Sequence, residues 1–184
     1  MKTILKRILL LLAKYIPYVD NMFFKWQLFT RVDFGLLTIN FIYQRIFRIN
    51  SLVPFSVHFT SRIIGFKNIE YFNDRNTAGS FCVSPHCYIQ ALSGIKIGKN
   101  FLFAPGIRLI SVNHGVNEEF KKQGSKPIVI GDNVWLGANV IILPEVVLGN
   151  NVVVGAGSIV TKSFADNVVI AGNPARIIKI NEPK

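Results

Sequence analysis

Charged residues are scarce in this 184-residue chain: they make up 17% of it, and 10 acidic residues stand against 21 Lys and Arg. Half of the residues are hydrophobic, which excludes an intrinsically disordered chain. Long apolar runs are missing too. The run Ile8–Ala13 ends at Lys14, and Phe34–Tyr43 is far shorter than the ~20 residues of a membrane-spanning helix. No small-residue cleavage site follows the first run, so we expect neither a signal peptide nor a membrane span.

Cysteine is almost absent, since Cys82 and Cys87 are the only two. Two cysteines make no disulfide framework, and five positions apart in an extended chain they would point to opposite faces. Their spacing matches no zinc motif. We therefore expect both thiols to be reduced, in a cytosolic protein.

The positive charge is concentrated near the N-terminus. The net charge is +11, and residues 1–48 carry eight of the basic residues but only two acids, Asp20 and Asp33. Either a solvated basic face or an anionic partner explains this pattern: a membrane surface, an anionic polysaccharide or nucleic acid. Nucleic acid fits poorly, because the basic residues are spread thinly among aliphatics and no recognised motif appears.

Two helices are predicted in this basic segment. The first carries an apolar stripe from Ile4 to Ile16 and ends at Pro17, and the second runs from about Asp33 to Arg48. Either helix could lie on a membrane, pack on a neighbouring subunit or cap the open end of a repeat array. After Pro54 no helical period is visible.

A repeat of six residues dominates the second half of the chain. Gly and a further apolar residue usually follow each repeated aliphatic residue, and the repeat runs without a slip through Ile130, Leu136, Ile142, Leu148, Val154 and Val160. This period is typical of a β-solenoid in which each hexad is one short strand and a corner, and three hexads form a coil. The aliphatic residues should point inward, while Gly, Asn and Asp should provide φ > 0 or tight backbone geometry at the corners.

The same period occurs earlier in the chain in another phase, over residues 97–114, and two degraded hexads are predicted over 83–94. Between residues 97–114 and the regular repeat that begins at Ile130, residues 115–129 (GVNEEFKKQGSKPIV) break the period. Insertions at the corners of a solenoid form loops that often line binding sites. We therefore predict an extruded loop at 115–129.

These motifs resemble the hexapeptide-repeat acyltransferases, and among them most closely the O-acetyltransferases of sugars and exopolysaccharides. The resemblance covers about residues 55–180 and rests on the hexads and on four blocks: Asn113–His114 before the loop, IGDNVWLGANVIILP at 130–144, GAGSIVTK at 155–162 and AGNPAR at 171–176. It implies an all-β solenoid, a left-handed parallel β-helix over residues 51–184, preceded by the basic helical segment 1–50. It also implies a homotrimer with acetyl-CoA bound in clefts between subunits.

The resemblance assigns roles to individual residues. A hydroxyl is a poor nucleophile, so acetyl transfer to it needs a base, and His114 matches the catalytic position. Ala138 would donate its backbone N–H to the oxyanion of the intermediate. Trp135, Ala156, Thr161, Lys162 and Arg176 would bind acetyl-CoA. Our candidates for contact with the acceptor are Asn113 and, apart from the resemblance, His86, which follows Pro85 in a degraded hexad. Glu145 departs from the family pattern, in which Gly follows the Pro of the I-L-P turn.

The implied function is acetyl-CoA-dependent O-acetylation of a sugar or polysaccharide precursor in the cytoplasm, with no metal. The N-terminal residues 1–48 could add peripheral contact with the inner membrane surface. Three alternatives stay open: an N-acetyltransferase for amino sugars or other amines, a zinc enzyme of the carbonic-anhydrase type and a non-enzymatic binding solenoid. The zinc enzyme needs converging histidines, two of them closely spaced, whereas His58, His86 and His114 are far apart in the chain.

Overall fold

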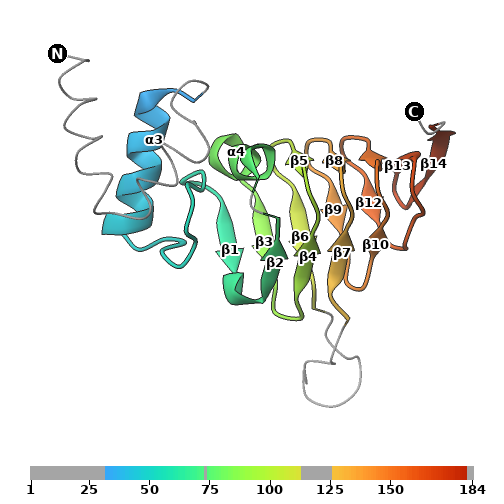
Figure 1. The fold of residues 1–184 in the computed structure, drawn as a ribbon, viewed down its shortest axis with the longest axis horizontal. Coiled ribbons are helices and arrows are strands. Elements are labelled where there is room, and N and C mark those ends of the chain that lie inside the picture. Colours follow the sequence, from blue (N-terminus) through green and yellow to red (C-terminus); the bar gives the residue numbers. More distant parts are fainter. Residues whose placement is uncertain (1–31, 73, 113–125, 182–184) are drawn as a thin grey trace.

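Three sheets of short strands build the molecule (Figure 1). A computed structural model of the chain describes residues 32–72, 74–112 and 126–181. Sheet A consists of β1 (Arg62–Ile64), β3 (Tyr88–Gln90), β6 (Arg108–Ile110), β9 (Ile141–Ile142) and β12 (Ile159–Val160). Sheet B consists of β2 (Ile69–Tyr71), β4 (Ile95–Ile97), β7 (Ile128–Ile130) and β10 (Val147–Leu148). Sheet C consists of β5 (Leu102–Phe103), β8 (Trp135–Leu136), β11 (Val153–Val154), β13 (Val168–Gly172) and β14 (Ala175–Ile180).

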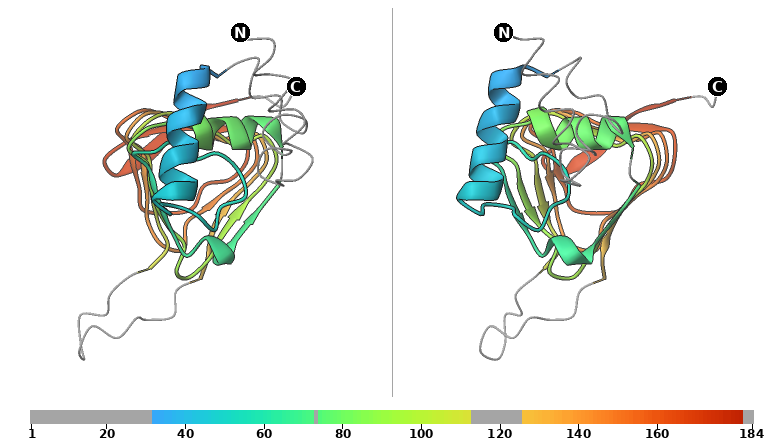
Figure 2. Two further views of the ribbon diagram at one scale, coloured as in Figure 1. Left: turned by 90° about the vertical axis from the view of Figure 1, so that its left-hand side faces the viewer. Right: turned by 60° about the vertical axis from the view of Figure 1, so that its left-hand side comes forward.

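The chain passes from sheet A to B to C and back to A, so it winds as a three-sided coil. Neighbouring strands within a sheet are parallel, apart from the antiparallel pair of β13 and β14. The ribbon has a triangular outline when seen toward the end of the coil (Figure 2). Residues 18 positions apart, such as Asp132 and Asn150, lie on top of one another. We name the three corners of the coil, in chain order, the A–B, B–C and C–A edges.

The repeated aliphatic residues fill the interior, as predicted. None of the six is more than 1% exposed: Ile130, Leu136, Ile142, Leu148, Val154 and Val160. Burial of each such side chain contributes about 1.5–3 kcal/mol. Because each stacks on its equivalents in the coils above and below, the six-residue period of the sequence becomes a continuous hydrophobic core.

The corners confirm the predicted backbone geometry. A left-handed residue recurs every six positions, with φ between 56° and 70°, at Asn133, Asn139, Glu145, Asn151 and Gly157. Asn and Gly tolerate this conformation. The glycines that follow the core residues serve a different purpose: a Cβ on Gly131 would lie 2.6 Å from the Gly149 carbonyl oxygen of the next coil. Glycine is therefore required there for close packing between coils.

The predicted second helix is confirmed. It begins after Asp33, whose side chain accepts hydrogen bonds from the Gly35 and Leu36 amides, and comprises α3 (Phe34–Phe41) and the π-helical turn η3 (Ile42–Ile46). It lies across the N-terminal end of the coil (Figure 1). The predicted first helix lies outside the described residues. Among the helices of the described ranges, none has the length and hydropathy needed to cross a membrane.

The structure contains a further helix, α4 (Arg75–Val83), that was not predicted from the sequence. It occupies the sheet C side of the first coil, where the Thr77 hydroxyl accepts a hydrogen bond from the amide of Phe101, just before β5, and the Ser80 hydroxyl accepts one from the amide of Phe103 in β5. The helix thus satisfies the edge strand of sheet C, which would otherwise expose unpaired amides. The interpretation of 83–94 as two degraded hexads was wrong at its start, since Val83 ends the helix. A short 3-10 turn, η4 (Phe66–Asn68), precedes β2.

The insertion between the two repeat blocks falls at the A–B edge. Lys99 and Asp132 lie in adjacent coils although they are 33 positions apart rather than 18. The predicted end of the loop at residue 129 was two residues too late, because β7 begins at Ile128 and pairs with β4. Ile128 is fully buried, so it belongs to the core of the coil and not to the loop.

Glu145, which departs from the family pattern, lowers the stability of the corner, because it is a non-glycine residue at φ 66°. Left-handed backbone costs roughly 1–2 kcal/mol, partly offset by the lower chain entropy of a non-glycine residue. We expect Glu145→Gly to raise the free energy of unfolding by about 0.5–1 kcal/mol in urea titrations. The control Glu70→Gly, in the extended strand β2, should lower it; a loss of stability in Glu145→Gly would contradict the account.

Candidate functional site

The B–C edge is closed by its own side chains. Asn100, Asn133, Asn151 and Asn167 form a ladder of side-chain hydrogen bonds of 2.9–3.0 Å. Backbone amides at this edge are also capped, as where the Asp132 N–H donates to Asn150 Oδ1 at 2.8 Å. Because its donors and acceptors are paired with each other, this edge stabilises the coil and offers little to a ligand.

The C–A edge has the opposite character. Pro85, Pro105, Ala138 and Ala156 occupy equivalent positions in successive coils, since the residue after each of the last three donates to the carbonyl oxygen one coil below. These bonds run from Gly106 to Pro85 (2.9 Å), from Asn139 to Pro105 (2.9 Å) and from Gly157 to Ala138 (2.7 Å). The corner therefore contains a continuous column of small residues.

Two amides of this column are open. The N–H groups of Ala138 and Ala156 have no acceptor among the described residues, whereas Pro85 and Pro105 carry no N–H at all. Next to them, the Trp135 side chain projects from β8 and is 52% exposed. The column thus presents two backbone donors, one coil apart, beside an exposed aromatic ring. Such a pair can bind the carbonyl oxygens of an extended ligand that lies along the coil.

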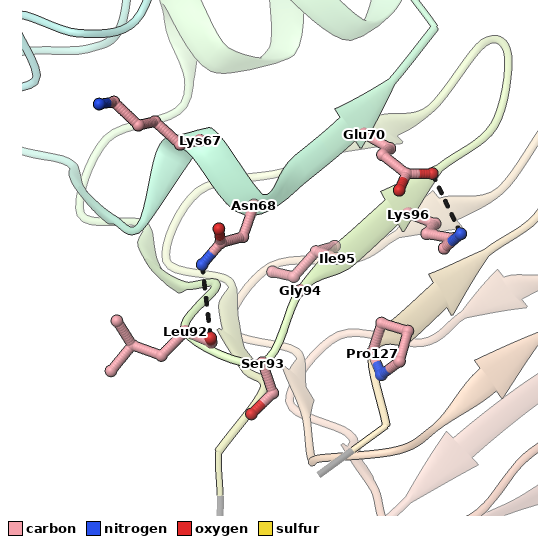
Figure 3. Close-up of a pocket in the computed structure, with 9 residues that line it drawn as sticks. All are labelled: Lys67, Asn68, Glu70, Leu92, Ser93, Gly94, Ile95, Lys96 and Pro127. Carbon is pink, nitrogen blue, oxygen red and sulfur yellow. Dashed lines mark hydrogen bonds and ion pairs between the residues drawn. The ribbon is translucent and has the colours of Figure 1, made fainter. Parts of the chain in front are cut away.

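The A–B edge holds the insertion and a cleft. The cleft has a volume of about 460 Å³ and lies beside Pro127, where the chain returns from the insertion (Figure 3). Its polar side chains are Lys67, Asn68, Glu70, Ser93 and Lys96. The cleft is mixed in charge, and both its hydroxyl and its amide suit a polar ligand such as a sugar.

Some groups in this cleft are already engaged. Asn68 Nδ2 donates to the carbonyl oxygens of Ala91 (3.0 Å) and Leu92 (3.4 Å), and Lys96 pairs with Glu70 at 3.1 Å. Lys67 is exposed and makes no ion pair with the described residues. Sequence reasoning missed the cleft, because its residues belong to the irregular first coils, where no hexad marks a corner.

The predicted acetyl-CoA residues divide between two edges of one chain. Trp135 and Ala156 lie at the C–A edge, and Arg176 follows the turn that continues this column, since the Gly172 amide reaches Ser158 Oγ at 3.1 Å. Thr161 and Lys162, by contrast, follow β12 at the A–B edge. Both of these residues are exposed. A single copy therefore does not bring the predicted set together.

The predicted catalytic and acceptor residues are distributed in the same way. Asn113 and His114 lie outside the described residues. Val112, which precedes them in the sequence, is the last residue of the described range 74–112 and lies at the A–B edge. Ala138 and His86 both lie at the C–A edge, where His86 follows Pro85 at φ 57°. Of the predicted base and oxyanion donor, the described residues therefore include only Ala138, at the C–A edge.

His86 has a second histidine close by. Thr60 Oγ1 accepts from the His86 amide (3.0 Å) and lies 3.0 Å from His58 Nδ1. The His58 ring stacks on Phe59 at a centroid distance of 4.7 Å. Burial, and secondarily the nearby His86, lower the pKa of His58.

The two cysteines are free and buried. Cys82 lies within α4, so the assumption of an extended chain between it and Cys87 was wrong. Burial raises the pKa of both thiols, which disfavours thiolate chemistry. In the described part of the chain, no three His, Cys, Asp or Glu side chains gather into a group that could hold a metal ion.

Comparisons with known proteins agree with this architecture. The family model described as bacterial transferase hexapeptide (six repeats) matches residues 127–162. A putative lipopolysaccharide biosynthesis O-acetyl transferase, WbbJ, from Escherichia coli K12 is 34% identical over 144 residues, covering 69% of this chain and 71% of the relative. The chain therefore belongs to the hexapeptide-repeat transferase family.

Two further similarities are more limited. The galactoside O-acetyltransferase of Escherichia coli K12 is 50% identical over 88 residues, which cover 46% of this chain and 43% of that protein. The chain thus spans less than half the length of this curated relative. A crystal structure of a mutant of AntD, an N-acyltransferase from Bacillus cereus, superposes with a TM-score of 0.50 at 17% identity, covering 70% of this chain and 81% of that one. This last similarity concerns the fold alone.

The lowered pKa of His58 makes the stability pH-dependent. Below its ordinary pKa of 6.5, the unfolded chain gains a proton at this residue that the folded chain resists, so stability falls with decreasing pH. The His58 Nδ1 that accepts from the Thr60 amide at 3.3 Å would also lose this bond on protonation. We expect the melting temperature to drop less between pH 7 and pH 5.5 in His58→Gln than in the wild type. Parallel curves for the two proteins would refute this.

Proposed function

We propose that the protein is an acetyl-CoA-dependent O-acetyltransferase that acetylates a sugar hydroxyl, with His114 as the general base. The pair of open amides at Ala138 and Ala156 carries the proposal. The named activities of the relatives, O-acetyl transfer in lipopolysaccharide biosynthesis and on galactosides, support it.

In the proposed reaction the His114 imidazole accepts the proton of the sugar hydroxyl as the oxygen attacks the thioester carbon of acetyl-CoA. The carbonyl oxygen gains negative charge and accepts a hydrogen bond from the Ala138 N–H. Collapse of the intermediate breaks the carbon–sulfur bond, and the CoA sulfur takes the proton from His114. Base catalysis by a positioned imidazole typically contributes about 10²–10⁴-fold to the rate.

The substrate acetyl-CoA would lie along the C–A edge. An amide oxygen of its extended arm would accept from the Ala156 N–H, and the exposed Trp135 ring would pack against it. Thr161, Lys162 and Arg176 would bind its phosphates, since cations and hydroxyls suit these groups. The Lys162 ammonium lies 5.7 Å from the centroid of the Phe164 ring.

This assignment requires more than one copy of the chain. Lys162 and Val112, two positions before His114 in the sequence, belong to the A–B edge, while Ala138 and Trp135 belong to the C–A edge. We infer a homotrimer in which the A–B edge of one copy faces the C–A edge of the next, with three active sites between subunits. We further infer that the coil is left-handed, that residues 51–184 form the acyltransferase domain and that residues 1–50 form a basic helical N-terminal segment.

The acceptor would enter from the N-terminal side of the column. In the proposed trimer the cleft beside Pro127 faces the His86 side of the neighbouring copy, so Asn113 and His86 would contact the sugar. The hydroxyl of Ser93 and the ammonium of Lys67 in this cleft suit a polar acceptor, a polysaccharide precursor in particular. We place the reaction in the cytoplasm, at the inner membrane surface if the precursor is lipid-linked.

Replacement of His114 tests the mechanism. His114→Ala should lower kcat by about 10²–10⁴-fold, because the hydroxyl loses its base. The assay measures acetyl transfer as the appearance of free CoA thiol, with a panel of sugars and amines as acceptors. Calorimetry should give an unchanged Kd for CoA, and this binding is the control for a folded protein. Wild-type turnover in His114→Ala would exclude the proposed base, and transfer confined to the amines would exclude O-acetylation.

A further inference from the structure

The segment from α3 through η3 to Phe47 buries two polar side chains beside the core residue Leu37 and exposes several apolar ones. Asn40 and Gln44 are 0% and 1% exposed, whereas Ile39, Ile46 and Phe47 are 41%, 65% and 63% exposed. A surface helix of a globular protein usually has the reverse arrangement. The outward side chains therefore call for an explanation that packing within the fold does not provide.

The inward amides have a clear structural role. Gln44 Nε2 donates to the carbonyl oxygens of Asn50 (3.2 Å), Val53 (3.1 Å) and Phe55 (2.8 Å), and its Oε1 accepts from the Val57 amide at 3.2 Å. This side chain satisfies the irregular segment that closes the coil. Polar residues are thus needed on the inner side of α3, whereas nothing in the coil requires apolar residues on the outer side.

We group the exposed apolar residues of this part of the chain under the name α3 outer face: Ile39, Tyr43, Ile46, Phe47 and Leu52. The Tyr43 ring lies 5.4 Å from the Phe47 ring and 5.2 Å from that of Phe59, so the aromatic part is packed together. Leu52 is 68% exposed. Contiguous exposed apolar residues of this kind mark an interaction surface, whereas single scattered ones do not.

The chain that carries this face has an excess of positive charge. Residues 33–69 contain Arg45, Arg48, Arg62 and Lys67 against one acid, Asp33, and residues 1–32 contain six further cations and one acid, Asp20. Apolar side chains bordered by cations are the combination that binds the interface of a bilayer with anionic lipids. We propose that the α3 outer face binds an anionic lipid surface.

The position of the face supports this role. α3 lies at the N-terminal end of the coil, and β14 lies toward the opposite end (Figure 1). Contact with lipid at this end leaves the three edges of the coil free for substrates. The proposal goes beyond acetyl transfer and does not depend on it, because a protein of any activity with this face would bind the membrane.

Vesicle flotation tests the proposal on the full chain. The variant Ile46→Ser/Phe47→Ser should reduce partitioning onto vesicles of phosphatidylcholine with phosphatidylglycerol by at least about tenfold, since two apolar side chains no longer enter the interface. Ile177→Ser/Ile178→Ser on β14 is the matched control, because these residues are 51% and 65% exposed at the other end of the coil. It should partition like the wild type, and pure phosphatidylcholine should bind the wild type less.

Equal partitioning of the two double variants would overturn the proposal. A change of mass in light scattering for Ile46→Ser/Phe47→Ser would also overturn it, because the face would then bind a second copy of the chain. Acetyl transfer to a soluble acceptor should be unchanged in both. An Ile46→Cys variant carrying an environment-sensitive fluorophore tests whether another part of the chain covers the face. The label goes to residue 46 because the native thiols are buried. Its emission should shift to the blue only when vesicles are added. A blue-shifted emission in buffer alone would mean that the chain itself covers the face.

Discussion

Stacking of residues 18 positions apart is the constraint on which the rest of the structure depends. Parallel pairing of the short strands holds each coil directly above the one before it, as in the pairing of Trp135 with Val153. Because of this register, every position of the repeat becomes a column that runs along the molecule. Aliphatic columns make the core, glycine columns allow the coils to approach, and corner columns make the three edges.

The edges differ because their columns differ. Asn and Asp side chains at the B–C edge reach from one coil to the next and consume the backbone donors there. At the C–A edge, alanine and proline have no side chain that can do so, and the amides of Ala138 and Ala156 stay available. In the proposed mechanism, the amides that this column leaves unpaired position the chemistry. The insertion falls at the A–B edge, and the proposed base, His114, directly precedes it in the sequence.

The sequence was most informative where the repeat is regular. The core positions from Ile130 to Val160, the left-handed corners at Asn133, Asn139 and Asn151, and the second helix at Asp33 could all be predicted, since each depends on local pattern alone. The first coils could not. There α4 replaces a strand of sheet C and its hydroxyls cap β5, an arrangement that depends on contacts between Thr77 and Phe101 and leaves no period in the sequence. The A–B cleft was missed for the same reason, and the roles of His114 and Lys162 still rest on resemblance.

The central claim is that an active site needs the A–B edge of one copy and the C–A edge of another. Copies carrying His114→Ala and copies carrying Ala138→Pro, each with its own affinity tag, can be expressed together and purified through both tags. Proline should fit at position 138, because Pro85 and Pro105 occupy the same corner, and it removes only the N–H. Each variant alone should be nearly inactive, while doubly purified trimers have one intact site and should recover about one third of wild-type activity. Mixed oligomers no more active than the separate variants would contradict the account.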